Sequence, residues 1–211
     1  IMAIGTNFEN ALLKAVRSLE MGKDSIVTPS LEALTDDELE TKLHSIDTER
    51  SFVVAEALRR GVTMEHIHEI TKIDIWFLKK VQNIVRMEQK IRALGSMAAL
   101  DAETMMAAKK MGMADSAIAR FVGCKTADIR MLRARLNVQP AFRMVDTCGG
   151  EFEAVSPYFY STYGTETEAK NSGRKTVVVL GSGPIRIGQG IEFDYCSVHC
   201  VWALKRAGFD T

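Results

Sequence analysis

Apolar residues recur every three or four positions through most of the first 140 residues, a spacing that predicts a series of amphipathic α-helices. No proline interrupts the chain between Pro29 and Pro140. The longest predicted helix covers residues 74–94, in which Glu88 and Arg92 form an i,i+4 pair in the favourable order. Its buried face is predicted to consist of Phe77, Val81, Ile84, Val85 and Ile91.

Polar side chains mark the expected helix starts. Thr35 and Glu38 form a capping-box pattern, in which a hydroxyl and a carboxylate accept hydrogen bonds from free backbone N–H groups. Residues 1–5 resemble the end of a lone strand, after which Thr6 and Glu9 predict a helix that reaches about residue 21. One further helix is predicted to end near Arg60, and the next is predicted to begin at Thr63. Three more are predicted over residues 101–111, 116–122 and 127–136.

The helical block contains an internal repeat. The pattern Ala-x3-Gly-x5-Ile occurs over residues 57–67 and again over residues 108–118, and in the same register Leu78 aligns with Ile129. Each unit is predicted to form a helix, a glycine stop, a short helix, a turn and another helix. We expect the two units to pack around one core.

The pattern changes after residue 140. Residues 141–163 hold six of the 15 aromatic residues and predict an extended segment that covers a neighbouring surface, and residues 164–173 form a polar linker. Residues 175–180 then predict a buried strand, followed by a glycine-rich turn and a helix over residues 194–207. The predicted fold is therefore mainly α, with the first β-turn-α unit of a parallel α/β domain at its end. Because one strand and one helix cannot complete such a domain, we expect a truncated piece of a longer protein.

The composition is typical of a globular protein and excludes several classes. The chain is 46% hydrophobic and 26% charged, and it contains no apolar run long enough to span a membrane. The first residues lack the pattern of a secretory signal, and four unpatterned cysteines favour a reducing, cytoplasmic location. Lys plus Arg and Asp plus Glu both number 27, which argues against a general role on nucleic acids or membrane surfaces.

The charges are nevertheless segregated along the chain. Residues 32–56 hold eight acidic and two basic residues, and residues 120–143 hold six basic residues and one acidic residue. These regions either dock against each other or against neighbouring subunits, or they are two solvated helix faces. Six of the 11 methionines lie between Met87 and Met113, as an adaptable core or a binding surface.

The glycine-rich turn over residues 181–190 is the strongest local signal for ligand binding. Glycines between a strand and a helix allow backbone N–H groups to approach a phosphate. The turn is not a dinucleotide fingerprint, because Arg186 replaces the third glycine, and it is not a P-loop, because Gln189 stands where that motif needs lysine. A tight turn without a ligand stays an alternative. The candidate glycines are Gly181, Gly183 and Gly188.

Two other patterns suggest chemistry. Cys196, His199 and Cys200 lie within one helical turn, but with no second ligand pair we predict buried small side chains and no metal site. Residues 116–133 match a helix-turn-helix with a row of arginines. The matching helix of the other repeat is apolar over residues 75–78, which argues against DNA binding. A helix-turn-helix DNA-binding protein with an appended nucleotide-binding α/β unit therefore stays the alternative hypothesis.

Four stretches of the chain together resemble the large chain of glutamine-hydrolysing carbamoyl-phosphate synthase. They are residues 55–61, residues 71–78, residues 145–152 with 160–163, and residues 180–195, of which the last two are highly specific. The resemblance implies three parts: residues 1–19 as the tail of a first ATP-grasp half, residues 20–168 as a helical oligomerisation domain, and residues 169–211 as the truncated pre-ATP-grasp start of the carbamoyl-phosphate-forming half.

The resemblance also implies a function. The family enzyme is a carbon–nitrogen ligase that makes carbamoyl phosphate from bicarbonate, glutamine-derived ammonia and two ATP, for arginine or pyrimidine biosynthesis. It uses ATP with magnesium or manganese and works with a glutaminase small chain. This chain would hold no catalytic residue, bind no cofactor itself, and act as a scaffold that self-associates through its helices. Nucleic-acid and membrane partners are not expected.

Two residues match positions that border the carbamate tunnel in the family. Gly190 would let the backbone approach the passage closely, and Glu192 would place a carboxylate near a reactive anion in a gating or orienting role. Excluding water from an unstable intermediate is the physical need that such a tunnel meets.

Overall fold

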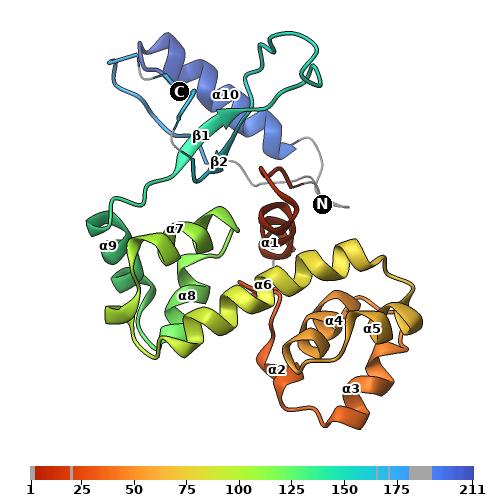
Figure 1. Ribbon diagram of the computed structural model, residues 1–211. Helices are drawn as coiled ribbons and strands as arrows, with labels where there is room; N and C mark the ends of the chain where they lie inside the picture. The colour runs from red at the N-terminus through yellow and green to blue at the C-terminus, as the bar shows by residue number, and fades with distance from the viewer. Residues whose placement is uncertain (1–2, 20, 165, 171, 181–191) are drawn as a thin grey trace. The chain divides into compact units, whose positions relative to one another are not determined.

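The computed structural model describes residues 3–19, 21–164, 166–170, 172–180 and 192–211 (Figure 1). The chain divides into two compact units, Met2–Thr167 and Glu168–Thr211. Helices dominate the described residues, which confirms the predicted mainly-α class. None of the described helices is long and apolar enough to cross a membrane.

The larger unit contains a series of helices followed by a β-hairpin. Its helices are α1 (Phe8–Ser18), α2 (Pro29–Glu32), α3 (Asp36–Leu43), α4 (Arg50–Arg59), α5 (Met64–Thr71), α6 (Ile75–Ala93), the 3-10 helix η1 (Met97–Ala99), α7 (Ala102–Lys110), α8 (Asp115–Val122) and α9 (Thr126–Arg135). Its strands are β1 (Ala141–Met144) and β2 (Phe159–Thr162).

Helix α6 is the element on which the rest of the larger unit packs. It contacts α1, α4 and α5 as well as α8, so it lies between the two helical groups drawn in orange and green in Figure 1. Its buried face matches the prediction at Val81, Ile84, Val85 and Ile91. Phe77 is different: it is 45% exposed, because in the first turn it packs against other surface rings. The prediction of Phe77 as a core residue is therefore wrong.

Helix caps follow the sequence signals with one exception. Both hydrogen bonds of the capping box between Thr35 and Glu38 are present, and the side chain of Thr63 caps α5. The start of α1 was predicted wrongly, because the side chain of Asn7, rather than Thr6, accepts from the N–H of Asn10 at 2.8 Å. Asparagine is among the strongest N-cap residues, so it determines where the helix begins. Residues 3–5 form no strand.

The two-unit repeat appears in the structure as equivalent backbone geometry. Gly61 after α4 and Gly112 after α7 have φ of 87° and 93°, and each is followed by a backbone hydrogen bond of 3.0 Å that runs back over five residues. The aligned Leu78 and Ile129 are both fully buried. The predicted duplication is thus a real repeat of fold as well as of sequence.

The methionine cluster belongs to the core. Met105 and Met113 are buried, and the other four methionines of residues 87–113 are half-buried. The four half-buried residues, Met87, Met97, Met106 and Met111, pack against the edge of the buried hydrophobic core. The structure therefore favours the core interpretation over a methionine-rich binding surface.

The aromatic segment after residue 140 forms a hairpin. Strands β1 and β2 pair antiparallel, with Ala141 opposite Thr162 and Met144 opposite Phe159. Ala141 and Thr162 are buried, whereas most aromatic side chains of the segment point into solvent: Phe142, Phe152, Tyr158 and Phe159. Tyr163 does pack against the buried helical core, so the expected cover of a neighbouring surface is seen at this residue and not at those four rings.

The smaller unit holds α10 (Glu192–Arg206) and one short pairing of extended chain. A single parallel bridge joins Thr176 to Asp210. Val178 and Leu180 are 78% and 89% exposed, so the prediction of a buried strand over residues 175–180 is wrong for this chain. A parallel strand becomes buried only when further strands and helices cover it, and the described residues supply one bridge.

Candidate functional site

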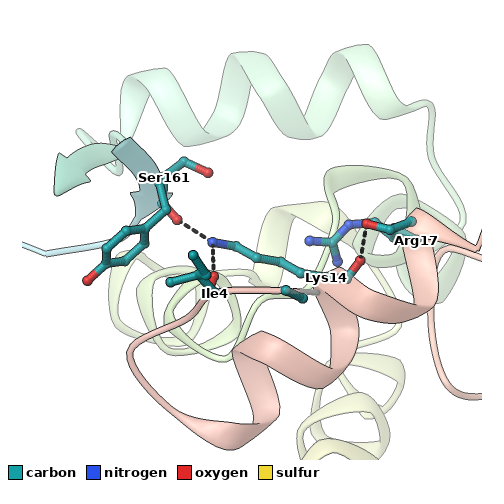
Figure 2. A pocket seen from close by; sticks show the side chains of 7 residues that line it. Ile4, Lys14, Arg17 and Ser161 are labelled. Atoms are coloured by element: carbon teal, nitrogen blue, oxygen red, sulfur yellow. Dashed lines mark hydrogen bonds between the residues drawn. The ribbon is translucent and has the colours of Figure 1, made fainter. Parts of the chain in front are cut away.

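A basic pocket lies in the larger unit, between α1, the helices α7 to α9 and strand β2. We use this name for two adjoining cavities of about 480 and 370 Å³ that share Lys14, Arg17 and Ser161 in their linings. Figure 2 shows the residues that line the larger one. The smaller cavity is also lined by the C-terminal end of α7, the start of α8 and one side of α9. Its charged lining residues are Lys14, Arg17, Lys109, Asp115 and Arg130.

Lys14 joins the N-terminal segment to the hairpin. Its Nζ donates hydrogen bonds to the carbonyl oxygens of Ile4 at 2.8 Å and Ser161 at 2.6 Å, as Figure 2 shows. The ammonium also lies 5.4 Å from the ring centroid of Tyr160. Burial and the nearby charge of Arg17 lower the pKa of Lys14 from its usual value.

Arg17 lies one turn further along α1 and reaches the end of α7. Its Nη1 donates to the carbonyl oxygen of Gly112 at 2.7 Å. Asn7 and Asn10 donate to the neighbouring carbonyl of Lys110, so α1 is held on the C-terminal end of α7, where helical carbonyls lack backbone partners. Burial lowers the pKa of Arg17.

Lys109, Asp115 and Arg133 form a largely buried charge triad beside the pocket, with Lys109 buried and the other two half-buried. Lys109 Nζ donates to Asp115 Oδ1 at 2.7 Å and to the carbonyl of Met113 at 2.6 Å, and Arg133 Nη2 lies 3.0 Å from Asp115 Oδ2. Burial lowers the pKa of Lys109. Burial opposes ionisation of Asp115, but the hydrogen bonds and charges of Lys109 and Arg133 outweigh it and lower the pKa of Asp115. The ring of Tyr163 covers both cations, at 5.2 and 5.7 Å.

The pocket therefore carries an excess of positive charge. Four cationic side chains line the smaller cavity against one carboxylate. Such an arrangement can hold an anion, because each added negative charge is attracted by several cations in a partly desolvated space.

Most of the site residues predicted from the sequence lie outside the residues that the structure describes. Gly181, Gly183, Gly188 and Gly190 fall outside the described residues, and Glu192 is the first residue of α10. Their tunnel and turn roles stay predictions.

Two family descriptions match this chain. The first, "Carbamoyl-phosphate synthetase large chain, oligomerisation domain", matches residues 1–137, well over half of the chain. The chain belongs to the carbamoyl-phosphate synthetase large-chain family. A second description, "Carbamoyl phosphate synthase preATP-grasp domain", matches residues 173–211.

Curated relatives of the synthetase family match the chain over its whole length. A carbamoyl phosphate synthase large chain of Agathobacter rectalis is 49% identical over 212 residues. Two large chains of Clostridium botulinum, from the Kyoto and Langeland strains, are each 52% identical over 211 residues. All of this chain is covered, and it spans about 20% of the length of each of these relatives.

The helix-turn-helix hypothesis concerns residues inside the part that matches the synthetase oligomerisation domain. Helices α8 and α9 do pack together around a left-handed Gly123. Arg120, however, is paired with Asp24 at 2.7 Å and Arg133 with Asp115, so two arginines of the supposed DNA-reading row are used within the chain. This pairing weakens the DNA-binding alternative.

The cysteine and histidine side chains of α10 in this chain were predicted to be buried, and that prediction is wrong. Cys196 and Cys200 are exposed, and the ring of His199 contacts those of Tyr195 and Trp202 in tilted arrangements, with ring centroids 4.1 and 5.1 Å away. The described part of the chain contains no group of three side chains placed to hold a metal ion.

Sequence reasoning missed the basic pocket, although the repeat held a signal. Lys109 aligns with Leu58, and Asp115 aligns with Met64, in the register of the two units. A buried ion pair thus replaces apolar side chains in the second unit only. A charged residue at a core position of one repeat could have marked the site.

Proposed function

We propose that this chain acts within a carbamoyl-phosphate synthase large chain, a cytoplasmic carbon–nitrogen ligase that makes carbamoyl phosphate from bicarbonate, glutamine-derived ammonia and two ATP. The order of the family matches carries the proposal, since an oligomerisation domain at residues 1–137 precedes a preATP-grasp domain at residues 173–211. In the proposed enzyme, ATP with magnesium or manganese is bound by other parts, and a glutaminase small chain supplies ammonia.

Within that enzyme we assign this chain a scaffold role and no chemical step. Its buried carboxylates support this role because they join neighbouring side chains of the helical unit. Glu56 Oε1 accepts from Arg59 at 2.6 Å and from Arg60 at 2.7 Å, and Glu88 Oε1 accepts from Arg92 at 2.8 Å. Burial opposes ionisation of Glu56, but the two arginines outweigh it and lower its pKa, so Glu56 is a weak proton acceptor.

Self-association is the second part of the proposal, with a second copy of the large chain as the partner. An aromatic patch is formed by Phe8 at the start of α1 and by Trp76 and Phe77 in the first turn of α6, with ring centroids 5.0–5.5 Å apart. Trp76 and Phe77 are 51% and 45% exposed. Exposed, mutually packed aromatic rings are the residue types that most often dominate the energy of protein interfaces. The oligomerisation-domain match supports placing the contact in this unit.

The scaffold role is tested by activity. The 211-residue chain should show no bicarbonate-dependent ATP hydrolysis and form no carbamoyl phosphate, whereas the full-length large chain with its small chain should do both. ATP turnover by the 211-residue chain above that of a mock preparation would contradict the proposal.

The contact is tested by light scattering of the full-length large chain across a dilution series. Trp76→Ala should shift dissociation to higher concentration by at least tenfold, because loss of a hot-spot ring costs about 2 kcal/mol or more. Tyr158→Ala is the matched control, since Tyr158 is 68% exposed on the hairpin and outside the aromatic patch. Equal shifts in both variants, or none in either, would remove the aromatic patch as the interface.

A further inference from the structure

The charge of the basic pocket is not explained by a scaffold role. Lys14, Arg17 and Arg130 line the smaller cavity, and none of them forms an ion pair with a carboxylate among the described residues. The one lining carboxylate, Asp115, is already shared by Lys109 and Arg133. Asp24 attracts Arg17 from outside the lining, so one carboxylate partly offsets the charge of Arg17. Clustered cations that outnumber the nearby carboxylates repel one another, so a cavity built in this way is stabilised by a bound anion.

Hydrogen-bond donors remain available for such an anion. Lys14 gives two of its three N–H groups to the carbonyl oxygens of Ile4 and Ser161. Arg17 gives one N–H of its five to Gly112. Arg130 is exposed on α9 and has no hydrogen-bond partner within the described part of the chain. Donors from α1 and α9 therefore meet at one cavity.

We propose that the basic pocket binds a phosphate group, with Lys14, Arg17 and Arg130 as the residues that contact it. Guanidinium groups present paired N–H donors that match phosphate oxygens, and an ammonium adds a compact charge. The adjoining cavities, about 480 and 370 Å³, have the size of sites that hold small metabolites. The phosphate comes either from the free ion or from a nucleoside monophosphate. This inference rests on the pocket geometry and does not depend on the proposed function.

The protonation behaviour of the pocket supports this assignment. Burial and the charge of Arg17 lower the pKa of Lys14, so its ammonium group loses a proton more readily than that of a free lysine. A phosphate beside Lys14 reverses this effect, because an opposite charge favours the protonated form. Since only neutral lysine reacts with acylating reagents, phosphate should protect Lys14 from acetylation by raising its pKa as well as by covering it.

The test measures acetylation of each lysine by mass spectrometry, in the 211-residue chain and again in the full-length large chain. Inorganic phosphate should protect Lys14 saturably in the millimolar range, while Lys79, exposed on α6, reacts equally with and without phosphate. Arg130→Gln should weaken this protection about tenfold, as expected for loss of one charge-assisted hydrogen bond. Arg135→Gln is the matched control, because Arg135 is exposed on the same helix and outside the pocket lining.

Protection by AMP and by chloride, compared with protection by phosphate, shows which ligand the pocket binds. Tighter protection by AMP than by phosphate identifies a nucleotide site that uses both cavities, and equal protection identifies a site for the phosphate group alone. Equal protection by chloride at the same ionic strength would reveal only charge screening and overturn the proposal. Protection that is unchanged in Arg130→Gln, or absent with both phosphate and AMP, would also overturn it.

Discussion

Gly61 and Gly112 end equivalent helices in the two repeats, but only Gly112 is pressed against another element. A Cβ atom at Gly61 would meet nothing within 4 Å, whereas one at Gly112 would lie 2.9 Å from Cα of Asn10. Both residues have positive φ, 87° and 93°. The second repeat therefore uses its glycine to end α7 and also to admit α1, which carries the pocket residues Lys14 and Arg17.

These two glycines allow a matched substitution test. Gly61→Ala should lower the free energy of unfolding by about 1–2 kcal/mol, because alanine at positive φ is strained. Gly112→Ala should lower it by about 1–3 kcal/mol more, because its methyl group overpacks against backbone that cannot rotate away. Urea unfolding followed by circular dichroism measures both. Equal losses in the two variants would show that α1 moves aside without cost.

Asp115 is expected to be a sensitive charged residue of the helical unit, because two cations share its carboxylate. Asp115→Asn leaves Lys109 and Arg133 without their shared counter-charge, and breaking a buried ion pair costs about 3–5 kcal/mol. The same urea measurement tests this. Glu69→Gln is the control, because Glu69 is exposed on α5 and should change stability by less than about 0.5 kcal/mol. A loss at Asp115 no larger than that at Glu69 would contradict the buried triad.

Glu88 predicts an unusual dependence of stability on pH. Burial raises the pKa of Glu88 above its ordinary value of 4.5, although Arg92 opposes the shift. Between 4.5 and the raised pKa the folded chain holds a proton that the unfolded chain has lost, so this residue makes stability fall as pH rises through that window. The contribution of Asp115 to the pH dependence of stability has the opposite sign. Because folding lowers the pKa of Asp115, this residue stabilises the folded chain at neutral pH, and that stability is lost as the pH falls through the folded-state pKa.

Glu88→Gln should therefore remove the fall in stability just above pH 4.5. The measurement is the free energy of unfolding of both proteins from pH 4.5 to pH 7. The difference between them should change with pH in that window and become constant above the raised pKa. A difference that is independent of pH throughout would mean that Glu88 titrates alike in the folded and unfolded states.

The tunnel prediction is tested in the full-length enzyme. Gly190→Ala or Glu192→Ala should raise the ratio of ATP consumed to carbamoyl phosphate formed, because an obstructed or unguarded passage loses carbamate between the two halves. A bulkier residue at 190 should raise the ratio further. If both substitutions merely loosen the turn, the melting temperature and all partial reactions should decline together with the ratio unchanged. That result would remove both residues from the predicted tunnel.

The sequence by itself determined the features that depend on neighbouring residues. The capping box at Thr35 and the glycine stops at Gly61 and Gly112 were predictable because each depends on hydrogen bonds to backbone groups within about one helical turn. The two-unit repeat was predictable because the same residue types recur at the same spacing. Apolar spacing likewise predicted the core face of α6, and four distinctive stretches indicated the family.

Tertiary structure alone decided the features that join distant segments. The basic pocket combines Lys14 and Arg17 with Lys109 and Arg130, and nothing in local spacing requires these side chains to meet. The exposure of Phe77 also depends on a distant segment, because its position in the first turn of α6 places its ring against Phe8 rather than in the core. Local hydrogen bonding specifies where helices begin and end, whereas long-range packing decides which of their faces and charges come together.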